Sequence, residues 1–338
     1  MTETELTNLA TRVLTAAGVG PADAADCARI LVLGDLFGHH THGVLRLEPY
    51  VERLRSGAMN AGAAIAVEAA APAIARIDAG NALGPVAGMR ALREAMARAR
   101  ELGVGMAVVR NGNHFGAITP YCHLAAQDGF AAIIGSNAST TIAPTGGRAT
   151  RLGNNPLALA VPQPGARPII LDMAMSVVAR GKIRAASQRG EAIPDSWATD
   201  REGKPTIDPA AALEGFLLPF GGYKGYGLAL MVDLFAGVLS DAAYLTHVHS
   251  WVDAPDAPGN LGHFFILIDV TRLGSAGWLA ARMADFARIV HDTPRADPAT
   301  PVRVPGEIEF EHYDRQQRDG IDLDAALVAR LEALASHP

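Results

Sequence analysis

The chain has few of the features that identify several simple protein classes. Only two cysteines, Cys27 and Cys122, occur among its 338 residues, far apart and in no paired-thiol motif. This pattern argues against a disulfide framework or a zinc finger and favours a reducing compartment. The formal net charge is -6, and basic and acidic residues are interspersed. The concentrated basic surface of a nucleic-acid-binding protein is therefore absent.

The sequence also lacks a long apolar run. Its most apolar stretch, Tyr226 to Leu239, contains Asp233 and is shorter than the roughly 18–20 residues that cross a bilayer. The first residues, MTETELTNLATRVL, are acidic and amphipathic, without the basic and apolar zones of a signal peptide. We therefore expect a soluble cytoplasmic protein with neither a membrane nor a nucleic acid as partner.

A third absence concerns nucleotide binding. The usual dinucleotide fingerprint is G-x-G-x-x-G between a strand and a helix. Gly103 and Gly105 precede a strand without a third glycine at the required spacing, and Gly84 and Gly88 open a helix without forming the triplet. A nicotinamide cofactor, if one binds, is not held by this fingerprint.

The composition favours a folded α/β protein. Hydrophobic residues make up 49% of the chain, which can bury a large core, and the length suggests two or three domains. Apolar periodicity predicts helices over 3–18, 21–36, 84–102, 118–128, 223–240, 275–291, 306–319 and 322–336. Strands are predicted within 64–78, 104–110, 130–136 and 262–270, with short strands among Gly and Pro turns from 137 to 222. The alternation of strand and helix from 73 to 136 indicates an α/β core.

The most informative stretch is GHHTHGVLRLEPYVERLRSG, residues 38–57. It places His42, Arg46 and Tyr50 at four-residue intervals, which stay near one face of a helix. Pro49 fits a first helical turn but not a helix interior. The alternative is that His42 lies on a loop and the helix starts near residue 48.

This stretch contains the residue types that handle a small 2-oxo or 2-hydroxy acid. The imidazole of His42 titrates near neutral pH and can accept or donate a proton. Arg46 can hold a carboxylate through two hydrogen bonds. The competing interpretation is a surface histidine beside an arginine that pairs with Glu48 or Glu52.

Three histidines close together, His39, His40 and His42, also suggest a metal site. Adjacent side chains point in different directions, and no acidic residue or distant histidine-rich partner stands out. His247 and His249 form another alternate pair that resembles a loop or a strand edge. We therefore expect no metal, and a metal-dependent hydrolase is only a distant alternative.

Three further segments have the chemistry of ligand loops. RNGNHFGA, residues 110–117, follows a buried strand, and its His114 can polarise a carbonyl or contact a nicotinamide amide; the alternative is a capping loop. LDMAMSVVARGKIR, residues 171–184, offers free N–H groups at a helix start to a pyrophosphate, or is an ordinary strand-to-helix junction. GGYKGYG, residues 221–227, has four glycines in seven residues beside Lys224 and predicts close backbone approach to a ligand, with a hinge as the alternative.

Taken together, these segments resemble the type 2 malate/L-lactate dehydrogenase family. That family also includes sulfolactate, ureidoglycolate and diketogulonate oxidoreductases and the Δ1-piperideine-2-carboxylate reductases. The stretches that match lie in the family's order and cover nearly the whole chain: GHHTHGVLRLEPYVERLRSG, RNGNHFGA, PTGGR with LGNNP, LDMAMSVVARGKI, GGYKGYGLALMVDLFAGVLS, GHFFILID and VPGEIE.

The resemblance implies a fold class, α/β (α+β), with a large, mainly antiparallel sheet that binds the dinucleotide without a Rossmann fold. It implies a helical domain built from both chain ends, residues 1–70 joined by 295–338, and an NAD(P)-binding domain over 71–294. It also implies a homodimer.

The resemblance implies a role for each site residue. His42 is the acid/base, Arg46 binds the substrate carboxylate, and His114 lies at the reacting centre near the nicotinamide. Substrate contacts are expected from Thr41, Tyr50 and Thr140 as well. Cofactor contacts are expected from Asp172, Met173, Ala174, Ser176, Gly181, Lys182, Tyr223, Lys224, Gly306 and Glu307. Two departures bear on the substrate: Thr41 stands where many members have serine, and His40 where many have aspartate.

The implied activity is the NAD(P)-dependent interconversion of a 2-hydroxy acid and a 2-oxo acid, similar to malate, lactate or sulfolactate. The cofactor is NAD or NADP, with NAD favoured. The nearest alternative uses the same scaffold to reduce a cyclic imino acid, Δ1-piperideine-2-carboxylate or Δ1-pyrroline-2-carboxylate.

Overall fold

The computed structural model describes residues 1–251 and 254–336. Its helices are α1 Glu3–Ala16, α2 Pro21–Leu36, α3 Leu47–Arg55, α4 Gly84–Leu102, α5 Thr119–Gln127, α6 Arg180–Arg189, α7 Pro209–Glu214, α8 Tyr223–Asp233, α9 Ala276–His291, α10 Glu307–Asp319 and α11 Ala325–Ser336. Its strands are β1 Ala66–Ala71, β2 Ile74–Asp78, β3 Val104–Gly112, β4 Phe130–Ser136, β5 Thr140–Ile142, β6 Leu152–Gly153, β7 Leu157–Val161, β8 Ile169–Met173 and β9 Leu261–Asp269. No helix among the described residues is long and apolar enough to cross a membrane.

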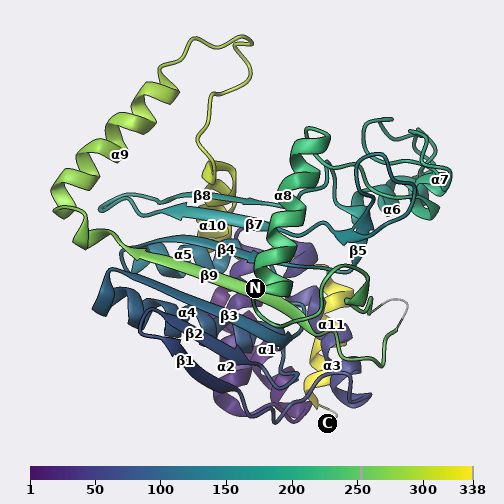
Figure 1. Cartoon of the computed structure of the whole chain (residues 1–338), viewed down its shortest axis with the longest axis horizontal. Helices are drawn as coiled ribbons and strands as arrows, with labels where there is room; N and C mark the ends of the chain where they lie inside the picture. Colours follow the sequence, from purple (N-terminus) through teal and green to yellow (C-terminus); the bar gives the residue numbers. More distant parts are fainter. Residues whose placement is uncertain (252–253, 337–338) are drawn as a thin grey trace.

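Seven strands form one sheet in the order β1-β2-β3-β9-β4-β7-β8. β2 and β3 are parallel and are connected by α4, whereas the other neighbouring strands run antiparallel. The predicted fold class, mixed α/β with a large and mainly antiparallel sheet, is confirmed. β9 comes late in the sequence but lies between β3 and β4, so the strand order does not follow the chain (Figure 1).

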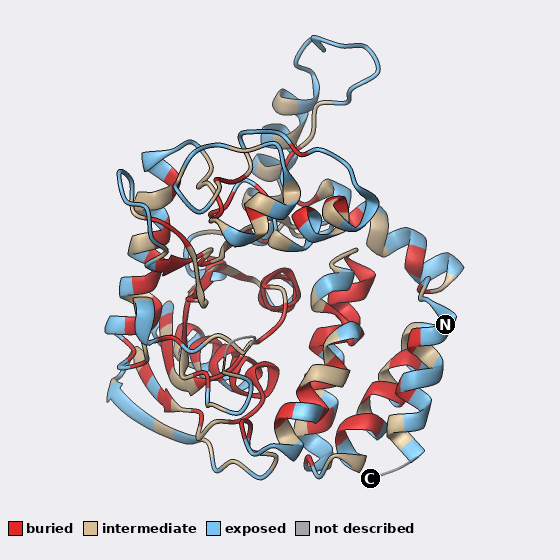
Figure 2. Cartoon of the chain, turned by 90° about the vertical axis from the view of Figure 1, so that its right-hand side faces the viewer, coloured by how far each residue is buried: buried red, intermediate tan, exposed pale blue. Residues whose placement is uncertain are grey.

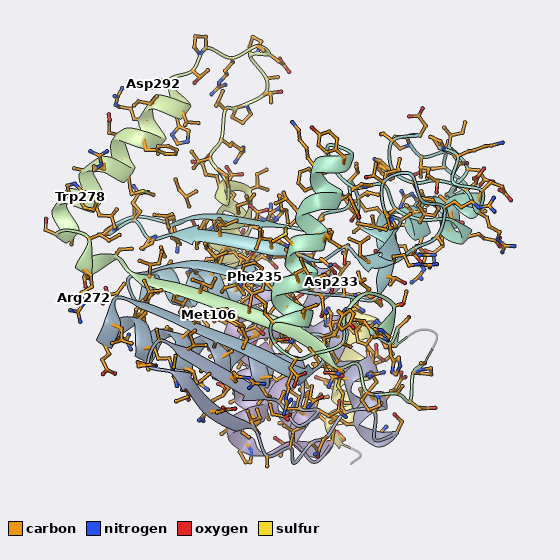
Figure 3. All side chains as sticks on the ribbon, in the orientation of Figure 1. Met106, Asp233, Phe235, Arg272, Trp278 and Asp292 are labelled. Atoms are coloured by element: carbon orange, nitrogen blue, oxygen red, sulfur yellow. The ribbon has the colours of Figure 1, made fainter. Side chains whose placement is uncertain are left out.

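The sheet separates two hydrophobic cores. Val109 of β3 and Phe265 of β9 belong to the core that contains α4 and the terminal helices. Their neighbours Val108 and Phe264 belong to the core beneath α8, because successive side chains of a strand point to opposite faces. Figure 3 shows the second face, where Phe235 follows α8 and lies over the sheet.

Helices from the two chain ends pack together beside the first core. α1 contacts α2 and α11, and α10 contacts α2. The Ile321 N–H donates to the Met1 carbonyl (2.7 Å), and the Gln316 side chain donates to the Asp35 carbonyl (2.8 Å). Figure 2 shows the ends of the chain on one side of the molecule. The division into domains 1–70 with 295–338 and 71–294 stays a prediction, and residues 337–338 lie outside the described residues.

Two of the predicted elements differ from the structure. The single helix expected over 223–240 ends at Asp233 and continues as a π-helical turn, Leu234–Val238. A π-helical turn is wider than an α-helical one. Its backbone packs directly on that of β9, because a Cβ on Gly262 would lie only 1.6 Å from the Ala236 carbonyl.

The short strands expected from 137 to 222 are present, but the region also contains α6 and α7. The glycine and proline residues of this region favoured a prediction of short strands and turns, so neither helix was expected. α6 is nevertheless rich in Ala, Arg and Lys, which favour helices, and it ends at Gly190, which has a φ of 67°.

Candidate active site

The His42 segment is a pair of tight turns before a helix. One 3₁₀ turn covers His40–His42, a second covers Val44–Arg46, and α3 then starts at Leu47. Pro49 lies in the first turn of α3, where its missing N–H costs nothing. The single helical face expected from the four-residue spacing is therefore wrong, and the loop alternative is confirmed.

A buried carboxylate fixes these turns. Asp35, only 1% exposed, accepts the Val44 N–H (2.7 Å) through Oδ2, and its Oδ1 lies 3.1 Å from His40 Nδ1. Burial raises the pKa of Asp35. The hydrogen bond that His40 donates to Asp35 raises the pKa of His40. A Cβ on Gly43 would lie 2.2 Å from the Asp35 carboxylate, so the backbone of the turn packs directly on this group.

Thr41 connects the predicted acid/base to the predicted carboxylate-binding group. Its hydroxyl lies 2.9 Å from His42 Nδ1, and its carbonyl accepts the Arg46 Nε–H (2.6 Å). Because Nδ1 is held by Thr41, the Nε2 edge of the His42 ring is the one available to a ligand. Thr41 thus orients both side chains.

His114 lies on the loop between β3 and α5, and its ring lies beside that of His42. The two imidazole rings are stacked, with centroids 5.4 Å apart and planes at 30°. The buried Tyr50 hydroxyl lies 2.8 Å from His114 Nδ1 and 2.9 Å from the His114 carbonyl. Both bonds form together only if the hydroxyl donates to the carbonyl and accepts from Nδ1–H. A neutral His114 then presents the lone pair of Nε2 as an acceptor.

The two imidazoles are held in their neutral forms. Burial, with smaller contributions from Arg46 and His39, lowers the pKa of His42 to about 4. Burial, followed by the charges of His42, Arg46 and His263, lowers the pKa of His114 well below its usual value. At neutral pH His42 is therefore a proton acceptor. A substrate carboxylate on Arg46 would offset the arginine charge and raise the pKa of His42 again.

A cavity of about 270 Å³ lies in front of the stacked rings, a size near the lower end for small-molecule sites. Of the predicted site residues, it is lined by His42, His114, Asp172, Met173 and Ala174. Arg46 lies at its margin. Thr140 on β5 follows Ser139, which lines the cavity, and accepts a hydrogen bond from Thr150 (3.4 Å).

Asp172, at the end of β8, has a structural partner. Its Oδ2 accepts the N–H groups of Ile118 (3.0 Å) and Thr119 (2.7 Å) and the Thr119 hydroxyl (2.9 Å). The carboxylate therefore caps the N-terminus of α5, where the helix dipole favours negative charge. It lies between the main cavity and a second depression that Gly306 also lines.

The remaining predicted cofactor residues do not line the cavity. Lys182, on α6, and Lys224, in the first turn of α8, are exposed, as are Gly181 and Tyr223. The Phe220 N–H donates to the Met175 carbonyl (3.0 Å), so the start of α8 lies next to the segment that follows β8.

Two predicted cofactor residues already bond to other groups of the chain. The Ser176 hydroxyl donates to the Val178 carbonyl (2.9 Å). Glu307 Oε1 lies 2.8 Å from His291 Nε2, and Glu307 Oε2 accepts the Val304 N–H (3.1 Å).

The three neighbouring histidines do not converge on one point. His39 Nε2 lies 3.2 Å from the Thr119 hydroxyl, His40 bonds to Asp35 and His42 to Thr41. Within residues 1–251 and 254–336, no group of three or more His, Cys, Asp or Glu side chains is placed to hold a metal ion.

The cavity also contains residues that the sequence did not indicate. Trp251 stacks on His114, and Arg53 lies under the loop that follows Trp251. Arg53 is seven residues after Arg46, two helical turns, and this spacing was the available signal. No pattern marked Trp251, because it lies in an irregular stretch just before Pro255, Pro258 and Gly259.

Comparison with known proteins identifies the family. Residues 1–332 match the family described as malate/L-lactate dehydrogenase. L-sulfolactate dehydrogenase of Methanothermobacter thermautotrophicus is 35% identical over 324 residues, which cover 96% of this chain and 92% of that protein. Δ1-pyrroline-2-carboxylate reductase of Ancylobacter novellus is 37% identical over 321 residues, covering 95% and 93%.

A solved structure gives the same result. Sulfolactate dehydrogenase from Methanocaldococcus jannaschii has a TM-score of 0.92 and 33% identity, covering 99% of this chain and 96% of that one. The prediction of a nicotinamide-dependent dehydrogenase or reductase is confirmed, and the chain belongs to the malate/L-lactate dehydrogenase family.

Proposed function

We propose that this protein interconverts a 2-hydroxy acid and the corresponding 2-oxo acid, with hydride transfer to or from NAD or NADP and His42 as the proton carrier. The observation that carries the proposal is the Thr41 link, which joins a neutral imidazole that lines the main cavity to a guanidinium that lines the depression beside it. An acid with a hydroxyl on its α-carbon needs both groups at this spacing.

Arg46 orients the substrate in this scheme. Its Nε–H is used by the Thr41 carbonyl, so its two amino nitrogens are the ones directed to the carboxylate. No ion pair to Arg46 is found among the described residues. A partly buried cation without a counter-ion is suited to an anionic ligand.

The direction of proton transfer follows from the protonation state of His42. In oxidation, neutral His42 accepts the hydroxyl proton while the α-hydrogen leaves as hydride; in reduction, protonated His42 donates to the carbonyl oxygen. When bound, the nicotinamide supplies the hydride acceptor or donor. His114 Nε2, as an acceptor, can hold the substrate hydroxyl or the amide N–H of the nicotinamide.

The cofactor residues are proposed on the same basis. Asp172, Met173 and Ala174 line the cavity, and Lys182 on α6 and Lys224 on α8 are exposed cations outside its lining. This arrangement fits a nicotinamide inside the cavity and a pyrophosphate outside it. NAD and NADP both remain in the proposal, with NAD favoured, and are compared directly in the assay below.

The alternative substrate is a cyclic imino acid. One relative at 37% identity is named Δ1-pyrroline-2-carboxylate reductase, and the same geometry serves its chemistry. Arg46 would bind the carboxylate, and His42 would protonate the imine nitrogen instead of a carbonyl oxygen.

A substrate panel tests both candidates. The purified protein is assayed with pyruvate, oxaloacetate and the cyclic imine, each with NADH and NADPH, by the nicotinamide absorbance. Turnover of an oxo acid at a kcat/KM at least about tenfold above that of the imine supports the first proposal. The reverse ratio supports the alternative, and no turnover with any pair contradicts both.

We also propose that the protein is a homodimer. α9 has no buried residue over its whole length, although Leu279, Met283, Phe286 and Val290 recur along it at spacings of four and three. A helix of this length is marginal alone in water, so its apolar side requires a partner surface. Figures 1 and 2 show this helix and the connector after it standing away from the sheet.

A second copy offers a matching apolar surface. Leu159 and Val161 of β7 and Leu171 of β8 are exposed at the far end of the sheet, beyond the part that α8 covers. Apolar faces on both a helix and a sheet of one chain are complementary in a symmetric pair.

Two buried, unpaired cysteines support the cytoplasm as the proposed location.

A further inference from the structure

The indole of Trp251 lies over two of the proposed site residues, His114 and Arg46. Its ring centroid lies 5.0 Å from that of His114, with the planes 28° apart. The guanidinium carbons of Arg46 and Arg53 lie 5.4 and 6.0 Å from the ring centroid, within the range of a cation–π contact. The indole therefore lies over the proposed carboxylate-binding group and over the imidazole next to the acid/base.

Arg53 contacts both the indole of Trp251 and the backbone of residues 255–257. It is only 6% exposed, and its two amino groups donate to the carbonyls of Pro255 (2.6 Å) and Ala257 (2.9 Å). Arg53 and Arg46 are seven residues apart, one in α3 and one at its start, so both guanidinium groups reach the loop from the same face. α3 thus fixes the substrate-binding arginine and the covering loop as one unit.

We propose that Trp251 is a specificity-determining residue: its indole limits the size of the group attached to the α-carbon of the substrate and keeps water from His42 and His114. This inference rests on the function proposed above. A carboxylate bound to Arg46 would lie beneath the indole. A bulky group on the α-carbon of the same acid would then clash with the indole. Excluding water also strengthens each charge interaction in the cavity.

Removal of the indole has a consequence for proton transfer. Trp251, His114 and His42 form a continuous stack of rings, and burial is the main cause of the low pKa of His42. Water admitted beside His114 raises the pKa of His42 toward its usual value. The titratable or charged groups that line the same cavity or its margin, besides His42, are His39, Arg46, Glu52, Arg53, His114, Asp172, His249 and Asp256.

The experiment compares Trp251→Leu and Trp251→Phe with the wild type. In Trp251→Leu, kcat/KM for 2-oxo acids with branched or aromatic chains should rise relative to pyruvate by at least about tenfold. Its kcat/KM for oxidation should fall by about tenfold between pH 8 and pH 5.5, because an imidazole with a pKa near 6.5 is then mostly protonated. The wild type and Trp251→Phe should lose little over the same range.

A binding measurement separates this role from loss of fold. An unreactive acid such as oxamate should change the tryptophan fluorescence of the wild type and of the control Trp197→Phe, but not that of Trp251→Phe. Trp197 lies outside the cavity, beside α6 and α7. If Trp251→Leu melts at the wild-type temperature yet keeps the wild-type substrate order and pH profile, the inference is wrong. If the wild type itself reduces no acid or imine, the proposed function has failed instead.

Discussion

At the scale of single residues, the site depends on an imidazole whose environment favours the neutral form. Burial and, to a smaller extent, the positive charge of Arg46 lower the pKa of His42. A histidine in this state suits the oxidative direction at neutral pH. In the reductive direction it needs the substrate's own negative charge to become protonated. The proposed function therefore predicts that substrate binding and proton uptake are coupled at this residue.

Replacement of His42 by Ala tests its role directly. Turnover should fall by about 10²-fold or more, since general acid/base catalysis supplies an effect of this size. Cofactor binding, followed by nicotinamide fluorescence, should persist. Near-normal turnover in this variant would remove His42 from the mechanism.

The pH dependence of oxidation tests the electrostatic account. Oxidation requires unprotonated His42, and the pKa of His42 is lowered to about 4, so wild-type kcat/KM should stay high as the pH falls through 6.5. In Arg46→Met the neighbouring positive charge is gone, so the pKa rises and activity is lost at a higher pH. The KM for the acid should rise as well, by about tenfold or more. An unchanged acid limb in Arg46→Met would contradict the coupling.

At the scale of elements, the two turns around Gly43 depend on α2. The Asp35 carboxylate, at the end of α2, receives the Val44 N–H, and the Gly43 backbone lies against it. α10 closes the same corner, because Gln316 donates to the carbonyls of Asp35 and Leu36 (2.8 and 3.0 Å). The proposed acid/base, His42, is thus positioned by helices from both ends of the chain.

Gly43→Ala should push the backbone of these turns away from the Asp35 carboxylate. The added Cβ would lie 2.2–2.3 Å from the carboxylate atoms, and overpacking of this kind costs about 1–3 kcal/mol. We expect a lower midpoint in urea unfolding and a loss of turnover larger than the loss of cofactor binding. Gly62→Ala is the matched control, because the nearest atom to its Cβ is 4.0 Å away. Equal stability of the two variants would show that the turn adjusts freely.

At the scale of the whole molecule, one face of the sheet is unevenly covered. α4 and α5 cover the first face, and α8 with the turn after it covers only part of the second. Figure 3 labels Trp278 and Asp292 near the two ends of α9, away from Phe235, which follows α8 and lies over the sheet. The exposed apolar residues of α9 and β7 are the reason to expect a second copy.

Trp278→Glu with Phe286→Glu tests the dimer. Both side chains are exposed, at 44% and 57%, and a charge on each opposes burial against an apolar partner. Light scattering should give twice the chain mass for the wild type and the chain mass for the double variant. Ile207→Glu, at an exposed apolar position elsewhere, should remain dimeric. A monomeric wild type would contradict the proposal.

The sequence by itself determined most elements and the absence of a Rossmann fingerprint, and it indicated His42, Arg46 and His114 as candidate site residues, because periodicity, glycine spacing and local motifs act within a few residues. It left the helix start before Pro49 open and concealed α6, α7 and the π-helical turn, where tertiary contacts outweigh local preference. Only the tertiary structure decided that β9 separates β3 from β4, that Asp35 holds the His42 turn, and that Trp251 covers His114. These contacts join residues far apart in the chain, and no local pattern specifies which distant surfaces meet when the apolar core is buried.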